Sequence, residues 1–141
     1  MLGPRCKEST GLRVLIVEDE ALVAMEIEGM LGLAGHEPVA HADDVASAIS
    51  AAEAEKPDLA LVDIQLAQGA SGLDVATELK KRGVPVMFAT GNCPIERGRG
   101  LALGCLHKPI TDHTLAASMA VADAVLHGRA TPRAPASLHL Y

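Results

Sequence analysis

The sequence predicts an α/β fold, in which a five-stranded parallel sheet is covered by helices on both faces. Short apolar runs alternate with longer amphipathic segments along residues 11–127. The strongest runs, at 12–17, 59–62 and 84–89, are almost entirely apolar, as in strands that are buried on both faces. The segments between them are long enough to be helices, so successive strands can be joined by crossovers and run parallel.

The helices are predicted from apolar periodicity and from residues that begin or end a helix. Gly35 suits a helix stop after a segment with helical spacing. Asp43 and Asp44 can cap the N-terminus of a second helix, and Ser71 can cap a third. We therefore expect helices at 21–33, 45–55, 73–82 and 111–127.

Two segments carry weaker patterns. Residues 37–42 have a less apolar strand pattern than the other runs. Segment 92–103 occupies a helix position but contains Pro94, Gly98 and Gly100, and a glycine inside a helix costs about 1 kcal/mol relative to alanine. We expect this segment to be short, frayed or mobile. The strands are expected at 12–17, 37–42, 59–62, 84–89 and 105–107.

Composition limits the classes of function. The chain has 141 residues, which favours one domain, and a net charge of −6, which disfavours binding to nucleic-acid phosphates. No apolar run reaches the ~18 residues of a membrane span, and residues 1–10 lack the apolar stretch of a signal peptide. We therefore expect a cytoplasmic protein with a flexible N-terminus at 1–10, one domain at 11–127 and a disordered tail at 128–141.

The three cysteines are Cys6, Cys93 and Cys105. Their number is odd, they lie far apart, and none forms a CxxC pair. We expect reduced thiols rather than a zinc site or a disulfide framework.

Polar side chains follow four of the predicted strands and form the candidate site: Glu18 and Asp19, then Asp63, Thr90 and Lys108. Ligands of an open parallel sheet bind beyond the carboxyl ends of its strands. A carboxylate cluster with room for water suits Mg²⁺. Each residue alone would be ordinary, but their convergence predicts that Asp63 is a nucleophile for phosphoryl transfer, with a hydroxyl and an ammonium beside it.

Four motifs, VLIVEDE, LALVDIQL, MFATGN and HKPI, resemble the receiver domain of two-component response regulators and occur in the order of that family. The resemblance covers residues 12–127 and implies a flavodoxin-like fold. It implies that Asp63 accepts a phosphoryl group from a histidine kinase or a phosphotransfer protein. Thr90 and Lys108 would contact that group and carry the response.

The resemblance also implies how Mg²⁺ would bind. Asp19 and Asp63 would ligate the ion directly, together with the backbone carbonyl of Gln65. Glu18 would act largely through water.

One departure from the family affects the switch. Many receivers carry an aromatic residue three positions before the lysine, whereas this chain has Cys105 there. The usual coupling of a threonine to an aromatic ring cannot operate in that form. We expect the switch region to comprise Thr90, Gly91 and Cys105 and to act through the backbone of segment 92–103.

Other features resemble a subgroup of single-domain receivers marked by a Phe-Ala-Thr-Gly motif. The chain has PVMFATG, and Ala67 stands where proline is common. This subgroup occurs in alphaproteobacterial stress signalling with histidine kinases of the HWE or a related type. Asn92 departs from the subgroup, because tyrosine or glycine is frequent after the glycine.

One enzyme class and one class of binding module fit the sequence less well. Enzymes of the haloacid-dehalogenase type carry a DxD pattern, in which the second aspartate is the general acid. In this chain Gln65 stands at the position of that second aspartate. A nucleotide or flavin module needs a phosphate-binding loop after the first strand, where EDEA would repel phosphate. We therefore expect a signalling domain that promotes its own phosphotransfer rather than an enzyme.

The sequence leaves no room for an output domain, so we expect a monomer that signals by docking to a downstream protein. The alternative is a receiver-fold scaffold, or a phosphate sink, without phosphorylation-dependent output. The sequence does not separate these two functions.

Overall fold

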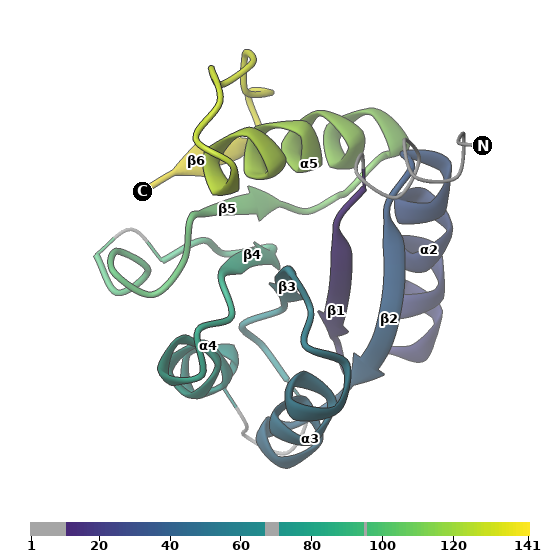
Figure 1. Ribbon diagram of the computed structural model, residues 1–141, viewed down its shortest axis with the longest axis vertical. Helices are drawn as coiled ribbons and strands as arrows, with labels where there is room; N and C mark the ends of the chain where they lie inside the picture. Colours follow the sequence, from purple (N-terminus) through teal and green to yellow (C-terminus); the bar gives the residue numbers. More distant parts are fainter. Residues whose placement is uncertain (1–10, 67–70, 95) are drawn as a thin grey trace, which may run out of the picture.

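The computed structural model describes residues 11–66, 71–94 and 96–141 and shows an α/β fold around one central sheet (Figure 1). The strand order is β2-β1-β3-β4-β5-β6. The first five strands pair in parallel, as predicted, and the unpredicted β6 pairs antiparallel with β5. The strands are β1 (Arg13–Val17), β2 (Glu37–Ala42), β3 (Leu59–Val62), β4 (Val86–Thr90), β5 (Gly104–His107) and β6 (Leu138–Leu140).

Helices cover both faces of the sheet, which confirms the predicted layers. One apolar cluster includes buried residues of α3 and α4, and another includes those of α2 and α5. The helices are α2 (Ala21–Leu33), α3 (Val45–Glu55), α4 (Gly72–Lys81) and α5 (Asp112–Leu126). The described residues of segment 92–103 form turns instead of a helix. In the part of the chain that the structure describes, no helix is long and apolar enough to cross a membrane.

The strands contribute to both apolar clusters because successive side chains point to opposite faces of a sheet. Leu15 and Val17 of β1 belong to the cluster under α3 and α4, whereas Val14 and Ile16 belong to the cluster under α2 and α5. This explains the nearly continuous apolar runs in the sequence. Phe88 on β4 is fully buried among aliphatic side chains.

The predicted caps are present at two helices. The Asp44 carboxylate accepts a hydrogen bond from the backbone N–H of Ser47 at 2.7 Å and begins α3. The Ser71 hydroxyl accepts one from the N–H of Leu73 at 3.1 Å and begins α4. Such caps satisfy backbone donors that have no partner inside the helix.

The prediction of a disordered tail at 128–141 is wrong at the C-terminal end. Leu138 is buried, and the N–H of Tyr141 donates to the carbonyl of Leu103 at 3.1 Å. The Tyr141 hydroxyl also donates to the carbonyl of Pro94. A three-residue strand is too short to show periodicity, and it is held because it pairs with the open edge of β5. The predicted flexible N-terminus, 1–10, lies outside the described residues.

The expectation of reduced thiols is wrong for two of the cysteines. Cys93 and Cys105 form a disulfide, with their Cα atoms 5.9 Å apart. Cys105 lies on β5 beside Phe88 of β4, and the chain turns back toward β5 soon after β4 ends at Thr90. Spacing along the sequence could not reveal this proximity. Cys6 lies outside the described residues.

A histidine holds the entry to β1. The N–H of Leu12 donates to Nδ1 of His36 at 2.9 Å. Burial lowers the pKa of His36 from its ordinary value, and the charge of Asp123 opposes that shift. Neutral His36 therefore suits the folded state, because its Nδ1 must accept a hydrogen bond.

We predict that His36 makes the folded state less stable at acidic pH. The unfolded chain binds the proton more readily, so stability is lost as the pH falls below about 6.5, toward the lowered pKa of the folded state. His36→Asn should lessen the loss in the free energy of unfolding between about pH 7.5 and 5.5, measured with urea. His113→Asn, at an exposed position, is the matched control. An unchanged pH dependence in His36→Asn would contradict this role.

Candidate functional site

Backbone pairing brings the carboxyl ends of the strands together. The N–H of Glu18 donates to the carbonyl of Ala42 at 2.9 Å, and the N–H of Asp63 donates to the carbonyl of Val17 at 2.9 Å. The N–H of Lys108 donates to the carbonyl of Thr90 at 3.0 Å. Each bond extends the pairing of a parallel strand by one residue. The predicted site residues therefore share one edge of the sheet.

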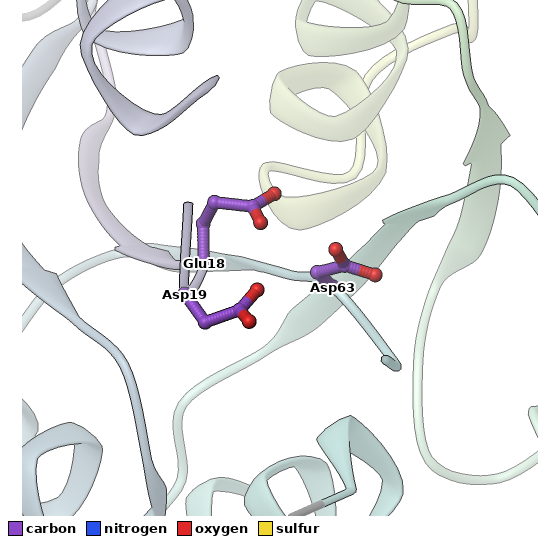
Figure 2. A group of neighbouring side chains, drawn as sticks. All are labelled: Glu18, Asp19 and Asp63. Carbon is purple, nitrogen blue, oxygen red and sulfur yellow. The ribbon is translucent and has the colours of Figure 1, made fainter. Parts of the chain in front are cut away.

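Three carboxylates gather at this edge. Figure 2 shows the side chains of Glu18 and Asp19 extending toward Asp63. One carboxylate oxygen from each residue lies within 4.8 Å of the others. Glu18 is 1% exposed and Asp63 is 6% exposed, whereas Asp19 reaches solvent. Buried carboxylates this close need positive charge or hydrogen-bond donors to be stable.

Lys108 provides positive charge between two of them. Its Nζ lies 3.0 Å from Oδ2 of Asp63 and 3.1 Å from Oε1 of Glu18. Burial by itself would lower the pKa of Lys108, but the hydrogen bonds and charges of the two carboxylates prevail and raise it. Lys108 contacts two of the carboxylates, and its single positive charge does not balance the three carboxylates of the cluster.

The excess negative charge acts on Glu18. Its pKa is raised, first by burial and then by the charge of Asp63. Hydrogen bonds from the N–H of Glu20 and from Lys108 act in the opposite direction. Protonation or a bound cation would relieve this repulsion.

The residues at this edge fit a divalent cation such as Mg²⁺. Carboxylate oxygens are the hard ligands that Mg²⁺ prefers, and Asp19 is accessible to water. The N–H of Gln65 donates to Oδ1 of Asp63 at 3.1 Å, which keeps the Gln65 backbone next to the cluster. The donor types and the net negative charge therefore suit a divalent cation.

The predicted switch residues, Thr90, Gly91 and Cys105, lie in different surroundings. Thr90 ends β4, is fully buried, and its hydroxyl has no hydrogen-bond partner among the described residues. An unpaired buried hydroxyl is costly, so Thr90 is suited to a ligand that arrives at this edge. Gly91 is exposed directly after it. Cys105 is instead held in the disulfide with Cys93.

Sequence reasoning missed one residue that positions Asp63. Gly72 opens α4, and its N–H donates to the carbonyl of Ile64 at 2.8 Å. A Cβ at this glycine would overlap the carbonyl of Asp63 and lie 2.6 Å from Cα of Ile64. The close approach is possible only for glycine. The signal in the sequence was a Ser-Gly pair at the start of a helix, a short distance after the aspartate.

The chain matches the family model of the response regulator receiver domain over residues 14–120. It belongs to this family. Receiver domains are signalling domains rather than enzymes with a turnover of their own.

Several relatives are regulators named PhyR. The chain is 44% identical over 79 residues to the phyllosphere-induced regulator PhyR of Methylorubrum extorquens. The aligned region covers 55% of this chain and 30% of that protein. The receiver domain of Erythrobacter litoralis PhyR superposes with a TM-score of 0.73 at 30% identity, covering 91% of this chain and 99% of that one.

A crystallised mutant of the anti-anti-sigma factor PhyR of Bartonella quintana superposes with a TM-score of 0.72 at 30% identity. The match covers 88% of this chain and 52% of that one. The chain thus spans only a part of the full-length PhyR proteins and corresponds to their receiver domain.

We predict that Gly72→Ala destabilises the fold by about 1–3 kcal/mol, because the new methyl group overlaps the backbone that carries Asp63. The free energy of unfolding in urea measures this loss. Gly29→Ala, in the interior of α2, is the matched control, because no atom outside its own helix lies within 4 Å of the added Cβ. That control should gain up to about 1 kcal/mol. Equal effects of the two substitutions would contradict the close approach.

Proposed function

We propose that the chain is a response regulator receiver domain that accepts a phosphoryl group on Asp63 in a Mg²⁺-dependent way. The observation that carries the proposal is the Lys108 ammonium between the Asp63 and Glu18 carboxylates, at the edge where Asp19 completes a magnesium-like donor set. A structural ion pair would need only one of these carboxylates. The remaining negative charge is explained by a site that holds a cation.

The chemistry is the transfer of a phosphoryl group between two nucleophiles. The P–N bond of a phosphohistidine breaks while a P–O bond to the Asp63 carboxylate forms, and the imidazole nitrogen keeps the electron pair of the broken bond. Lys108 holds one oxygen of Asp63, and the N–H of Gln65 holds the other. Bound Mg²⁺ would neutralise charge on the transferring group and would be held by Asp19, Asp63 and the Gln65 carbonyl, with Glu18 acting through water.

After transfer, two residues would detect the phosphoryl oxygens. Lys108 would exchange part of its contact with Glu18 for the new dianion. The Thr90 hydroxyl, which has no partner in the described structure, would donate to the same group. Since the Thr90 carbonyl already accepts from the N–H of Lys108, the two responses are linked through the backbone.

An apolar surface beside the site is suited to the phosphoryl donor. Leu22 and Met25 of α2 are 76% and 62% exposed, which is unusual for large apolar side chains. A pocket of about 200 Å³ lies between other residues of α2 and the chain after β5, and it includes Lys108. The pocket is lined by Val23, Glu26, Ile27, Met30, Lys108, Pro109 and Ile110. A helix of a histidine kinase or phosphotransfer protein could bury these side chains while presenting its histidine to Asp63.

The relatives support a place in stress signalling. The domain is similar to those of PhyR proteins, one of which is named an anti-anti-sigma factor and another a stress response regulator. We assign the cognate donor to histidine kinases of the HWE or a related type, or to a phosphotransfer protein, and the output to a docked protein. We also assign a cytoplasmic location, a monomeric state and a receiver domain at 11–127.

We predict that Asp63→Asn abolishes phosphorylation, because the amide lacks the nucleophilic oxygen. Intact-mass spectrometry after incubation with acetyl phosphate and Mg²⁺ should show one added phosphoryl group on the wild type and none on the variant. Chelation of Mg²⁺ with EDTA should also remove the label from the wild type. Asp74→Asn, an exposed carboxylate in the first turn of α4, should label normally. Undiminished labelling of Asp63→Asn would overturn the assignment.

We predict that Leu22→Glu with Met25→Glu slows phosphoryl transfer from a protein donor by about tenfold, which corresponds to about 1.4 kcal/mol of lost docking energy. The donors to be measured are phosphorylated kinases of the HWE type and phosphotransfer proteins. Labelling by acetyl phosphate should not change. Leu33→Glu, which is 81% exposed at the far end of α2, is the matched control. Equal slowing with acetyl phosphate would mean that the variant damages the site instead of the docking surface.

A further inference from the structure

Several contacts tie the described residues of the segment that follows Thr90 to their surroundings. Cys93 is bonded to Cys105 on β5. The carbonyl of Pro94 accepts a hydrogen bond from the Tyr141 hydroxyl, and the carbonyl of Gly100 accepts one from the Lys80 ammonium. Of these ties only the disulfide is covalent and can be made or broken by a chemical reaction.

The disulfide spans the route between the site and the C-terminal strand. Cys93 lies three residues after Thr90, whose hydroxyl is buried and unpartnered among the described residues. Cys105 is fully buried between two strands, with Phe88 of β4 as its neighbour on one side and His139 of β6 on the other. Any shift of the backbone after Thr90 is therefore resisted by a covalent bond to the strand that carries β6.

We propose that Cys93 and Cys105 form a redox-active pair that decides whether phosphorylation of Asp63 changes the structure of β5 and β6. This proposal rests on the proposed function, in which Asp63 is a phosphoryl acceptor. With the disulfide closed, the chain accepts the phosphoryl group, but Thr90 cannot move the segment after it. With both thiols free, Thr90 can move, and the change reaches Cys105 and the strand paired with it.

The location of the pair fits this role. In the reducing cytoplasm that the proposed function implies, disulfides are usually transient and redox-sensing rather than structural. Cys105 also occupies the position where many receivers carry the aromatic residue that moves with the threonine. If the disulfide at this position is reduced, the backbone is free to move, and this motion would take the place of the motion of an aromatic ring.

The reaction balances with a dithiol reductant of the thioredoxin class. Its thiolate attacks the sulfur of Cys93, because residue Cys93 is partly exposed whereas Cys105 is fully buried. The bond between the two sulfurs breaks, a mixed disulfide forms at Cys93, and Cys105 takes up a proton as a thiol. The second thiol of the reductant then releases Cys93 as a thiol. The chain gains two electrons and two protons, and the reductant ends as a disulfide.

The test uses the full chain with Cys6→Ser, so that Cys93 and Cys105 are the only cysteines. Amide NMR spectra are recorded with Mg²⁺, before and after addition of beryllofluoride, which mimics a phosphoryl group on aspartate. The oxidised chain is compared with the chain reduced by dithiothreitol, and thiol titration confirms each state. We expect signals around Asp63 to shift in both states. Signals of 104–107 and 138–141 should shift in the reduced state and lose that response in the oxidised state.

A second variant controls for effects of the reductant. With Cys93→Ser added, no disulfide can form, so 104–107 and 138–141 should respond without dithiothreitol. Equal responses in the oxidised and reduced chains would overturn the redox inference and leave the phosphoryl site intact. Thiol titration that finds both thiols free under oxidising conditions would overturn it as well. If signals around Asp63 shift in neither state, the phosphoryl site itself is overturned, and the redox inference falls with it.

Discussion

The site depends on one partly buried interaction, the contact of the Lys108 ammonium with the carboxylates of Asp63 and Glu18. Each of the three residues follows a different strand, so the contact exists only if β1, β3 and β5 hold their parallel register. Breaking such a pair by removing one partner typically costs about 3–5 kcal/mol, because an uncompensated charge is left behind. The charges therefore require the sheet, and the sheet brings the charges together.

The single ammonium of Lys108 does not neutralise all the carboxylates at the site. Lys108 neutralises part of the cluster, while burial and the charge of Asp63 still raise the pKa of Glu18. Stability alone does not require all of these carboxylates, because a single carboxylate is enough to pair with Lys108. Negative charge retained at a buried edge is a feature of sites that bind a cation and then a second charged group. The Thr90 hydroxyl, unpartnered among the described residues, is suited to that second group.

Much of the fold was predictable because its determinants are local. Apolar runs and caps such as Asp44 located five strands and four helices, and the carboxyl-end rule placed Asp63 and Lys108 at one edge. Features that depend on long-range contacts were missed. The need for glycine at Gly72 arises from the approach of α4 to the backbone of Asp63. β6 is too short to leave a pattern in the sequence and is held by pairing with β5.

The disulfide was also missed because it depends on a long-range contact. It joins Cys93 to the predicted strand β5, which pairs with the unpredicted β6. The chain has only two aromatic residues, and they lie on opposite sides of β5: Phe88 on β4 and Tyr141 just after β6. Cys105 lies between these strands, is fully buried and is held in the disulfide with Cys93. In the proposed switch, a signal that crosses β5 would move the backbone itself. Its freedom to move is set by what ties the segment after Thr90 to β5, and the bond from Cys93 is the strongest of those ties.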